Sequence, residues 1–304
     1  MIVTVVIPVY RDGMRAMAAA KAMLAQALPG EWSLELIIVD DGSGDGTAAE
    51  LANFADPRVN VIALPENVGR SAARNAGARD SRGSVLIFMD CDCLPCDDYF
   101  VAAHVTTLSH SVASTGRIVG SGTGFWDRYQ CEASMQRERH HGAGMTYVGS
   151  SSNLAIRIAA FKAIGGFDTV YRTYGFEDRD LLIRLARIGT VAWCKDAGVR
   201  HMDALSLEGV GEKMFAAGQF ASRRFSQDHP AEYDSLGYRA VDARHSVLLR
   251  FVAPMAGAFA RFGARSLDRT HALQWLPYPV SSVVARTIGA MHYLAGTAAS
   301  RIPM

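Results

Sequence analysis

Short apolar runs alternate with amphipathic segments through the first ninety residues. Runs rich in β-branched residues are typical of buried strands, whereas apolar positions at helical spacing are typical of helices that pack on a sheet. The expected strands are Ile2–Val9, Leu34–Val39, Val59–Leu64 and Val85–Met89, and the expected helices are Gly13–Leu28, Thr47–Phe54 and Gly69–Arg79. Because the strands are continuously apolar, the alternation predicts an α/β fold whose mostly parallel sheet has helices on both faces.

The pattern changes in the second half of the chain. From about 116 to 152 it becomes irregular and polar, helical and strand signals return over 159–200, and the part after His201 is mostly helical. A length of 304 residues fits one large α/β domain with an appendage. We therefore expect one α/β domain over 1–203, with a second half from about 116, and a helical C-terminal extension over 204–304.

Composition excludes some classes of protein and indicates a compartment. A formal net charge of +1 gives no reason to expect a nucleic-acid partner. The N-terminal residues run into an apolar stretch without a basic segment, so no signal peptide is expected. Five cysteines make no disulfide framework, and Cys93-x-x-Cys96 lacks the second pair typical of a structural zinc site. These features favour a cytoplasmic protein.

The C-terminal segment is basic. Between Arg239 and Arg301 there are eight arginines, no lysine and two aspartates, and eight minus two leaves a local net charge of +6. A helical, apolar tail that carries arginine favours attachment to an anionic membrane surface, here the cytoplasmic face of the inner membrane, or to a protein partner. No uncharged apolar run approaches the roughly 20 residues of a spanning helix, so we do not expect the chain to cross a membrane.

Acidic and aromatic side chains gather where the expected strands end. In parallel sheets, ligands bind beyond the carboxyl ends of the strands. Several carboxylates at one edge repel one another unless a cation or a hydrogen-bonding ligand lies between them. The side chains at these strand ends are Tyr10, Asp12, Asp40, Asp41, Asp90 and Asp92.

Asp90 and Asp92 form a D-x-D sequence directly after an apolar strand. Hard divalent cations such as Mn²⁺ and Mg²⁺ require oxygen ligands of this kind. If the backbone stays extended, the two carboxylates share a face; in a turn, one reaches the metal and the other a ribose or a water. Taken alone, so short a motif is matched by many polar loops, so its interpretation depends on its context.

The context is a series of motifs that resembles the family-2 glycosyltransferases over about residues 4–201. One motif alone is weak, but their order and spacing are those of the family. They are Val6-Ile7-Pro8-Val9-Tyr10, Val39-Asp40-Asp41-Gly42-Ser43, Glu66-Asn67-Val68-Gly69 with Ala73-Arg74-Asn75, Asp90-Cys91-Asp92, Gly165-Gly166-Phe167-Asp168 and Gly175-Phe176-Glu177-Asp178.

The resemblance implies a fold of the GT-A type and a role for each matching residue. The residues that it places at the nucleotide or donor sugar are Pro8, Tyr10, Asp12, Asp41, Arg70, Arg74, Asp90, Cys91 and Asn153. It implies Asp92 as the principal metal ligand, with Asp90 and His201 as further candidates. It implies Asp178 as the catalytic base, with Glu177 beside it on the acceptor side. Apart from the resemblance, Trp126 is a candidate for stacking on an acceptor sugar ring.

Three of these assignments have simpler structural alternatives. Glu177 and Asp178 precede a helical pattern, where acids are common because they complement the helix dipole. A lone histidine such as His201 is as readily structural as a metal ligand. Trp126 fits a stacking surface for an acceptor sugar or a position in the core.

The implied activity is transfer of a sugar, with inversion, from a nucleotide diphosphate donor, most simply a UDP-sugar, to a hydroxyl of a saccharide or lipid-linked saccharide. This is the chemistry of bacterial surface polysaccharide and glycolipid synthesis. Processive synthases carry Gln-x-x-Arg-Trp, which the segment from Gln219 to Arg224 does not match, so we expect transfer of one or few sugars. Arg11 stands where many relatives have Asn, which leaves the donor open.

Other classes fit the sequence less well. An oxidoreductase needs G-x-G-x-x-G after the first strand, and this chain has Pro8 to Asp12 there instead. A sugar nucleotidyltransferase shares the layered fold but not the late Glu-Asp pair. A degenerate sugar-binding or scaffold protein would not need the intact acids Asp90, Asp92 and Asp178.

Overall fold

The computed structural model describes residues 1–299, which form two compact units. The first unit comprises Met1–Gly122, Gln130–Arg172 and Asp178–Asp203. The second comprises Thr123–Tyr129, Thr173–Glu177 and the described part of Ala204–Met304.

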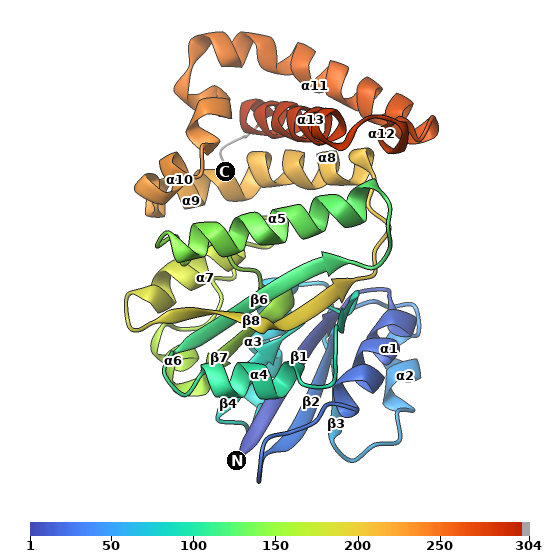
Figure 1. The fold of residues 1–304 in the computed structure, drawn as a ribbon, viewed down its shortest axis with the longest axis vertical. Helices are drawn as coiled ribbons and strands as arrows, with labels where there is room; N and C mark the ends of the chain where they lie inside the picture. The colour runs from blue at the N-terminus through green and yellow to red at the C-terminus, as the bar shows by residue number, and fades with distance from the viewer. Residues whose placement is uncertain (300–304) are drawn as a thin grey trace. The chain divides into compact units, whose positions relative to one another are not determined.

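The described strands of the first unit form an eight-stranded sheet in the order β3-β2-β1-β4-β7-β6-β8-β5 (Figure 1). The strands β1 to β4 pair in parallel, β6 pairs in parallel with β8, and β7 and β5 are antiparallel to their neighbours. This is the expected α/β fold with a mostly parallel sheet. The strands are β1 (Ile2–Val9), β2 (Ser33–Asp40), β3 (Val59–Ala63), β4 (Val85–Phe88), β5 (Cys93–Pro95), β6 (Ala113–Gly120), β7 (Leu154–Arg157) and β8 (Val191–His201).

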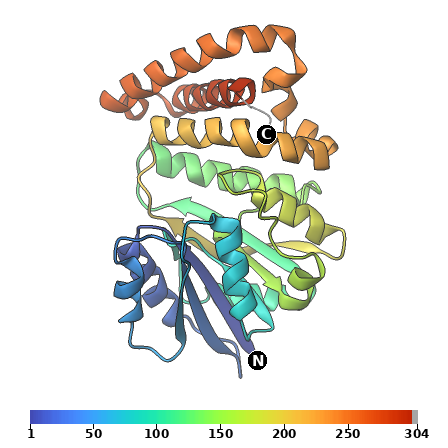
Figure 2. The same cartoon turned by 180° about the vertical axis from the view of Figure 1, so that it is seen from behind.

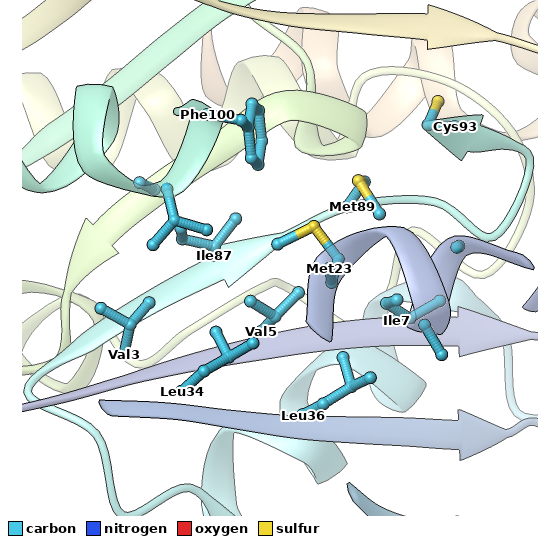
Figure 3. Close-up of a cluster of buried hydrophobic side chains, with 14 of the residues drawn as sticks. Val3, Val5, Ile7, Met23, Leu34, Leu36, Ile87, Met89, Cys93 and Phe100 are labelled. Atoms are coloured by element: carbon cyan, nitrogen blue, oxygen red, sulfur yellow. The ribbon is translucent and has the colours of Figure 1, made fainter. Parts of the chain in front are cut away.

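The central strands are apolar throughout because both of their faces are buried. Along β1 successive side chains point to opposite faces. Val5 and Ile7 join one core cluster, and Val6 joins the cluster on the other face. Figure 3 shows the first cluster, in which Met23 and Phe100 from helices lie over side chains of the strands.

Helices cover both faces of this sheet, as Figures 1 and 2 show from opposite sides. Alanines of α1 contribute to the first cluster, and alanines of α3 contribute to the second. The helices that lie wholly in the first unit are α1 (Gly13–Leu24), α2 (Thr47–Ala52), α3 (Arg70–Asp80), α4 (Phe100–Thr107), α6 (Ile158–Ala163) and the short 3-10 turn η1 (Ser151–Asn153). Two more helices, α5 (Phe125–Gly142) and α7 (Glu177–Ala186), begin in segments of the second unit and continue in the first.

The expectation of irregular structure over 116–152 is wrong. The stretch contains the end of β6 and the 18-residue helix α5. Charged and polar side chains occupy nearly every face of α5, so the apolar period that marks a packed helix is missing from its sequence. Its turns are fixed by contacts such as the ion pair between Arg117 and Glu138 (3.0 Å), which sequence spacing does not reveal.

The second unit is helical, as its sequence pattern predicts. A π-helical turn joins α8 to α9. The small buried side chains of α11 and α13 pack together with Phe125 and Leu207 in its largest described core cluster. Its elements are α8 (Leu207–Ala216), η2 (Ala217–Ala221), α9 (Ser222–Asp228), α10 (Pro230–Ser235), η3 (Tyr238–Val241), η4 (Ala243–His245), α11 (Val247–Arg269), α12 (Ala272–Trp275) and α13 (Tyr278–Ala299).

Candidate active site

The turn after β1 connects the ends of two strands. Asp12 caps the N-terminus of α1, where its carboxylate accepts a hydrogen bond from the Arg15 backbone N–H at 3.4 Å. The Arg15 guanidinium lies 3.3 Å from Asp12 and 3.3 Å from Asp203, which follows β8. Asp12 therefore acts as a helix cap in this structure, and Arg15 holds the end of β1 beside the end of β8.

Tyr10 offers an exposed aromatic ring at the same edge of the sheet. Its side chain is 44% exposed, and the Arg11 guanidinium lies 5.0 Å from its ring centroid. The Arg11 backbone N–H donates to the Ser43 hydroxyl at 2.8 Å, so the loops after β1 and β2 are held together. Pro8 lies two residues earlier and pairs with Val39 in the sheet. An exposed ring beside a cation is suited to stacking on a planar ligand.

Asp41 organises the loop that precedes α3. Its carboxylate accepts backbone hydrogen bonds from Val68 at 2.8 Å and Gly69 at 3.0 Å. Burial raises the pKa of Asp41 above its ordinary value, while the two donors act in the opposite direction. Gly42 allows this close approach: its φ is +67°, and a Cβ there would lie 2.2 Å from the Glu66 carbonyl carbon.

Arg74 and Asp90 form a largely buried ion pair at the end of β4. An Arg74 Nη donates to Asp90 at 2.5 Å, and the Arg74 side chain is 1% exposed. Burial disfavours the charged Asp90 carboxylate, but the positive charges of Arg74 and Arg70 and the Ser152 hydrogen bond outweigh it and hold the pKa of Asp90 at about 2. Asp90 is thus ionised at neutral pH.

Two further nitrogens of the Arg74 guanidinium, Nε and Nη1, are buried, and neither donates a hydrogen bond to a described residue. Leaving donors of a cation unsatisfied in the interior is costly, and an anionic ligand relieves this cost. Arg70 begins α3, one turn earlier on the same helix. This end of α3 is therefore suited to hold a phosphate group.

The backbone of the D-x-D segment forms a turn and does not stay extended. Asp92 lies in this turn, and its backbone C=O accepts a hydrogen bond from the Met202 N–H at 2.8 Å. The strand after the turn pairs with β8 so that Cys93 lies opposite His201. As a result His201 Nε2 lies 3.4 Å from an Asp92 carboxylate oxygen, although the two residues are far apart in sequence.

Asp92 and His201 together fit a divalent cation. A carboxylate and an imidazole form a mixed donor set that suits Mn²⁺, and Mg²⁺ also takes carboxylate oxygens. No described group of three or more His, Cys, Asp or Glu side chains surrounds one point. Asp92 and His201 would therefore be a partial set of ligands, of the kind that substrate phosphates and water complete.

Two serines connect Asp90 to Asp178. The Ser152 hydroxyl donates to Asp90 at 2.7 Å, and the Ser150 hydroxyl donates to Asp178 at 3.1 Å. The two hydroxyl oxygens are 3.3 Å apart. The other carboxylate oxygen of Asp178 is buried and has no hydrogen-bond partner among residues 1–299. The structure thus brings together the strand-end acid and the helix-end acid, which are 88 residues apart in the printed sequence.

Glu177 and Trp126 lie in short segments of the second unit. Glu177 is buried, and its carboxylate accepts from the Gly175 N–H at 2.9 Å at the start of α7. Trp126 is half-buried in the first turn of α5, with its ring 5.0 Å from Phe125 and 5.5 Å from Tyr129 in edge-to-face geometry. Contact of either residue with an acceptor remains a prediction.

Asn153 is enclosed by protein, and Cys91 is half-buried. The Asn153 side chain is 0% exposed and hydrogen-bonds to His104, Arg117 and Ala197 at 2.8 to 2.9 Å. This placement makes Asn153 a positioning residue below the serine turn. Burial raises the pKa of the Cys91 thiol, so Cys91 is a protonated side chain at neutral pH.

Four residues of this site were not predicted from the sequence: His104, Ser150, Ser152 and Asp203. Ser150 and Ser152 stand in a Gly-Ser-Ser-Ser-Asn segment of which only the Asn was singled out. Serine-rich turns commonly supply side-chain donors, and that signal was available. Nothing in the local pattern around His104 or Asp203 indicates their contacts, because their partners come from distant strands.

Comparisons with known proteins identify families and structures to which this chain is similar. The profile described as glycosyl transferase family 2 matches residues 4–165. A glycosyltransferase, AglE, of Haloferax volcanii is 29% identical over 175 residues, which are 54% of this chain and 55% of that protein. The chain thus spans about half the length of this curated relative.

Solved structures share the fold. A mannosyltransferase of Pyrobaculum calidifontis in complex with GDP-Man and Mn²⁺ superposes with a TM-score of 0.61 at 19% identity, over 95% of this chain and 85% of that one. S. aureus TarS 1-349 in complex with UDP-GlcNAc gives a TM-score of 0.52 at 15% identity, over 98% and 90%. Since the family profile covers more than half of the sequence, the chain belongs to glycosyl transferase family 2 and is a glycosyltransferase.

Proposed function

We propose that this enzyme transfers a sugar, with inversion at the anomeric carbon, from a nucleoside diphosphate sugar to an acceptor hydroxyl. The donor is most simply a UDP-sugar, and the acceptor is a saccharide or a lipid-linked saccharide. The observation that carries the proposal is the bridge of Ser150 and Ser152, which places the Asp178 carboxylate beside the acid-rich end of the sheet.

The residues divide the chemistry between them. The acceptor oxygen forms a bond to the anomeric carbon while the bond from that carbon to the phosphate oxygen breaks, and the diphosphate leaves with the electron pair. The Asp178 carboxylate takes the proton of the acceptor hydroxyl. Attack from the face opposite the leaving group inverts the anomeric centre.

Positive charge near the leaving group supports the other half of the reaction. Arg74 and Arg70 would hold the diphosphate, since the Arg74 guanidinium has donors to spare. Asp92 and His201, with Asp90 nearby, would hold Mn²⁺ or Mg²⁺, whose chemistry is Lewis-acid stabilisation of charge on phosphate oxygens. The neighbouring structures bind GDP-Man with Mn²⁺ and UDP-GlcNAc, which supports a donor of this chemical class.

The exposed Tyr10 ring would stack on the nucleotide base, with Pro8 and Asp41 shaping the loops around it. We assign the donor site to residues 1–203, with the acceptor side from about 116 and including Glu177 and Trp126. Residues 204–304 would attach the enzyme to the cytoplasmic face of an anionic membrane that carries the acceptor, or to a protein partner. The local charge of +6 between Arg239 and Arg301 supports this attachment.

Replacing the base tests the proposal. We expect Asp178→Asn to lower release of nucleoside diphosphate from a panel of nucleotide sugars on the order of 100- to 10,000-fold, because the amide accepts no proton. Donor affinity, measured by calorimetry, should change by less than about 3-fold. Asp196→Asn removes an exposed carboxylate from β8 and serves as the matched control. Turnover of Asp178→Asn near that of the control would remove Asp178 from the role of base.

A further inference from the structure

The helix α11 has its small residues inside and its large apolar residues outside. Its buried positions are Ala253, Gly257, Ala260 and Ala264. A Cβ at Gly257 would lie 2.7 Å from the Ala295 Cβ, so the backbones of α11 and α13 approach closely. The exposed large apolar side chains, 39 to 78% accessible, are Val247, Leu248, Phe251, Val252, Met255, Phe259 and Phe262.

These exposed side chains form one stripe. At 100° per residue they fall within an arc of about 140° around the helix axis. Single exposed apolar residues scattered over a protein surface are common. A contiguous apolar surface of this kind, in contrast, marks a site of interaction. Trp275 follows in α12 and is 83% exposed.

Arginines lie on one side of the helix: Arg250 and Arg261 fall between the stripe and the buried face, and Arg269 falls within the arc of the stripe near the C-terminal end of the helix. Arg250, Arg261 and Arg269 are exposed, and no described acidic side chain lies within ion-pair distance of them. The helix has one acid, Asp268, whose carboxylate accepts from the backbone N–H groups of Leu207 and Glu208 at the start of α8. The surface around the stripe is therefore positive, which matches an anionic partner with an apolar layer beneath its charges.

The same helix meets the length and composition of a membrane span, but its packing favours another geometry. Within its most apolar window 22% of residues are buried, and α11 contacts both α8 and α13. Its uncharged run from Phe251 to Ala260 is shorter than the roughly 20 residues that a spanning helix needs. A helix with one face packed on protein and a broad apolar face outside is suited to lie in the plane of a membrane interface.

We propose that α11 binds flat on an anionic bilayer, with its aromatic and aliphatic stripe among the upper acyl chains and its arginines at the lipid phosphates. This refines the proposed membrane attachment of 239–304 by naming the helix, the face and the orientation. It does not depend on sugar transfer, because the test below contains neither nucleotide sugar nor acceptor.

The test is co-flotation of the full chain with vesicles of phosphatidylcholine containing 30% phosphatidylglycerol, as a chosen composition, at about 0.1 M salt. We expect the double variant Phe251→Ser/Phe259→Ser to lose at least about 10-fold in vesicle affinity, because two aromatic side chains no longer enter the acyl layer. Arg250→Ala/Arg261→Ala should lose about 10-fold and become less sensitive to salt. Matched controls are Tyr99→Ser and Arg187→Ala, exposed positions of the first unit, which should bind like wild type.

Several results would overturn the proposal. One is equal flotation of wild type and the aromatic double variant, with thermal unfolding showing that both are folded. A second is retention in the membrane pellet after alkaline carbonate extraction, because a flat helix is released and a spanning one stays. A third is a dimer in analytical ultracentrifugation that the aromatic variant abolishes while wild type ignores vesicles, which would make a second copy the occupant. If the membrane proposal fails while all variants turn over nucleotide sugars normally, the proposed transfer reaction still stands.

Discussion

At the scale of single residues, the site depends on side chains that hold the acids in place. Ser150 donates to Asp178 and Ser152 donates to Asp90. A hydrogen bond to a charged group contributes about 1.5 to 3 kcal/mol. The orientation of the Asp178 and Asp90 carboxylates is therefore set by two neighbouring hydroxyls of one turn.

Removing these hydroxyls separately should have different effects. We expect Ser150→Ala to lower kcat on the order of 10-fold with little change in KM for the donor, because only the base loses a donor group. Ser152→Ala should act mainly on donor KM, through Asp90 and its partner Arg74. Ser151→Ala changes the same turn without removing a hydrogen bond to either acid, so it should behave as wild type. Partial rescue by Ser150→Thr, measured in steady-state kinetics, would separate positioning from folding; identical losses in all three alanine variants would contradict this assignment.

At the scale of elements, a buried histidine joins a helix to the sheet beneath the serine turn. His104 of α4 hydrogen-bonds to Ser114 of β6 at 2.9 Å and to Asn153 of η1 at 2.8 Å. Burial lowers the pKa of His104 to about 4, slightly opposed by the Asn153 hydrogen bond. The neutral imidazole is thus part of the support for the active-site turn.

This burial predicts a pH dependence of stability. Between pH 6.5 and 4 the unfolded chain binds a proton at His104 that the folded chain excludes, so the free energy of unfolding falls as the pH falls through this window. The contribution of this group is complete above pH 6.5, and its loss by pH 4 is about 3 kcal/mol. The free energy of unfolding can be measured with urea at several pH values. Between pH 6.5 and 4, His104→Gln should lose less of this free energy than the wild type. The exposed His110→Gln should show the wild-type dependence of this free energy on pH. A wild-type slope in His104→Gln would show that another group carries the effect.

Helices and strands were predictable from the sequence where their apolar positions all face one large sheet or lie within it. The strands from β1 to β4 follow continuous apolar runs, and α1 and α3 follow helical spacing, because both pack against one large sheet. The helix α5 was missed because its polar surface carries no period. The sequence indicated a helical, apolar C-terminal segment, but it did not indicate that the large residues of α11 face outward.

At the scale of the whole molecule, a donor and a cation that bind together should stabilise the folded protein. A ligand at 100 times its Kd stabilises a protein by about 2.7 kcal/mol, provided that it binds only the folded state. We expect a nucleotide sugar with Mn²⁺ to raise the Tm, and EDTA to abolish most of this increase and the turnover. Asp92→Asn should lose the Mn²⁺-dependent part of the increase in Tm, while Asp98→Asn, at an exposed position, should keep it. An undiminished ligand shift and undiminished turnover in EDTA would reject metal assistance.

The sequence by itself determined the class of fold, the order of the motifs and most of the acids of the site. It did so because apolar runs specify buried strands, and because parallel strands must deliver their carboxyl ends to one edge. The sequence did not decide which acids meet. That Asp92 lies beside His201, and that two serines join Asp90 to Asp178, follows from the antiparallel pairing of β5 with β8 and from the turn before β7. Such contacts between residues distant along the chain depend on strand register and packing, which only the tertiary structure fixes.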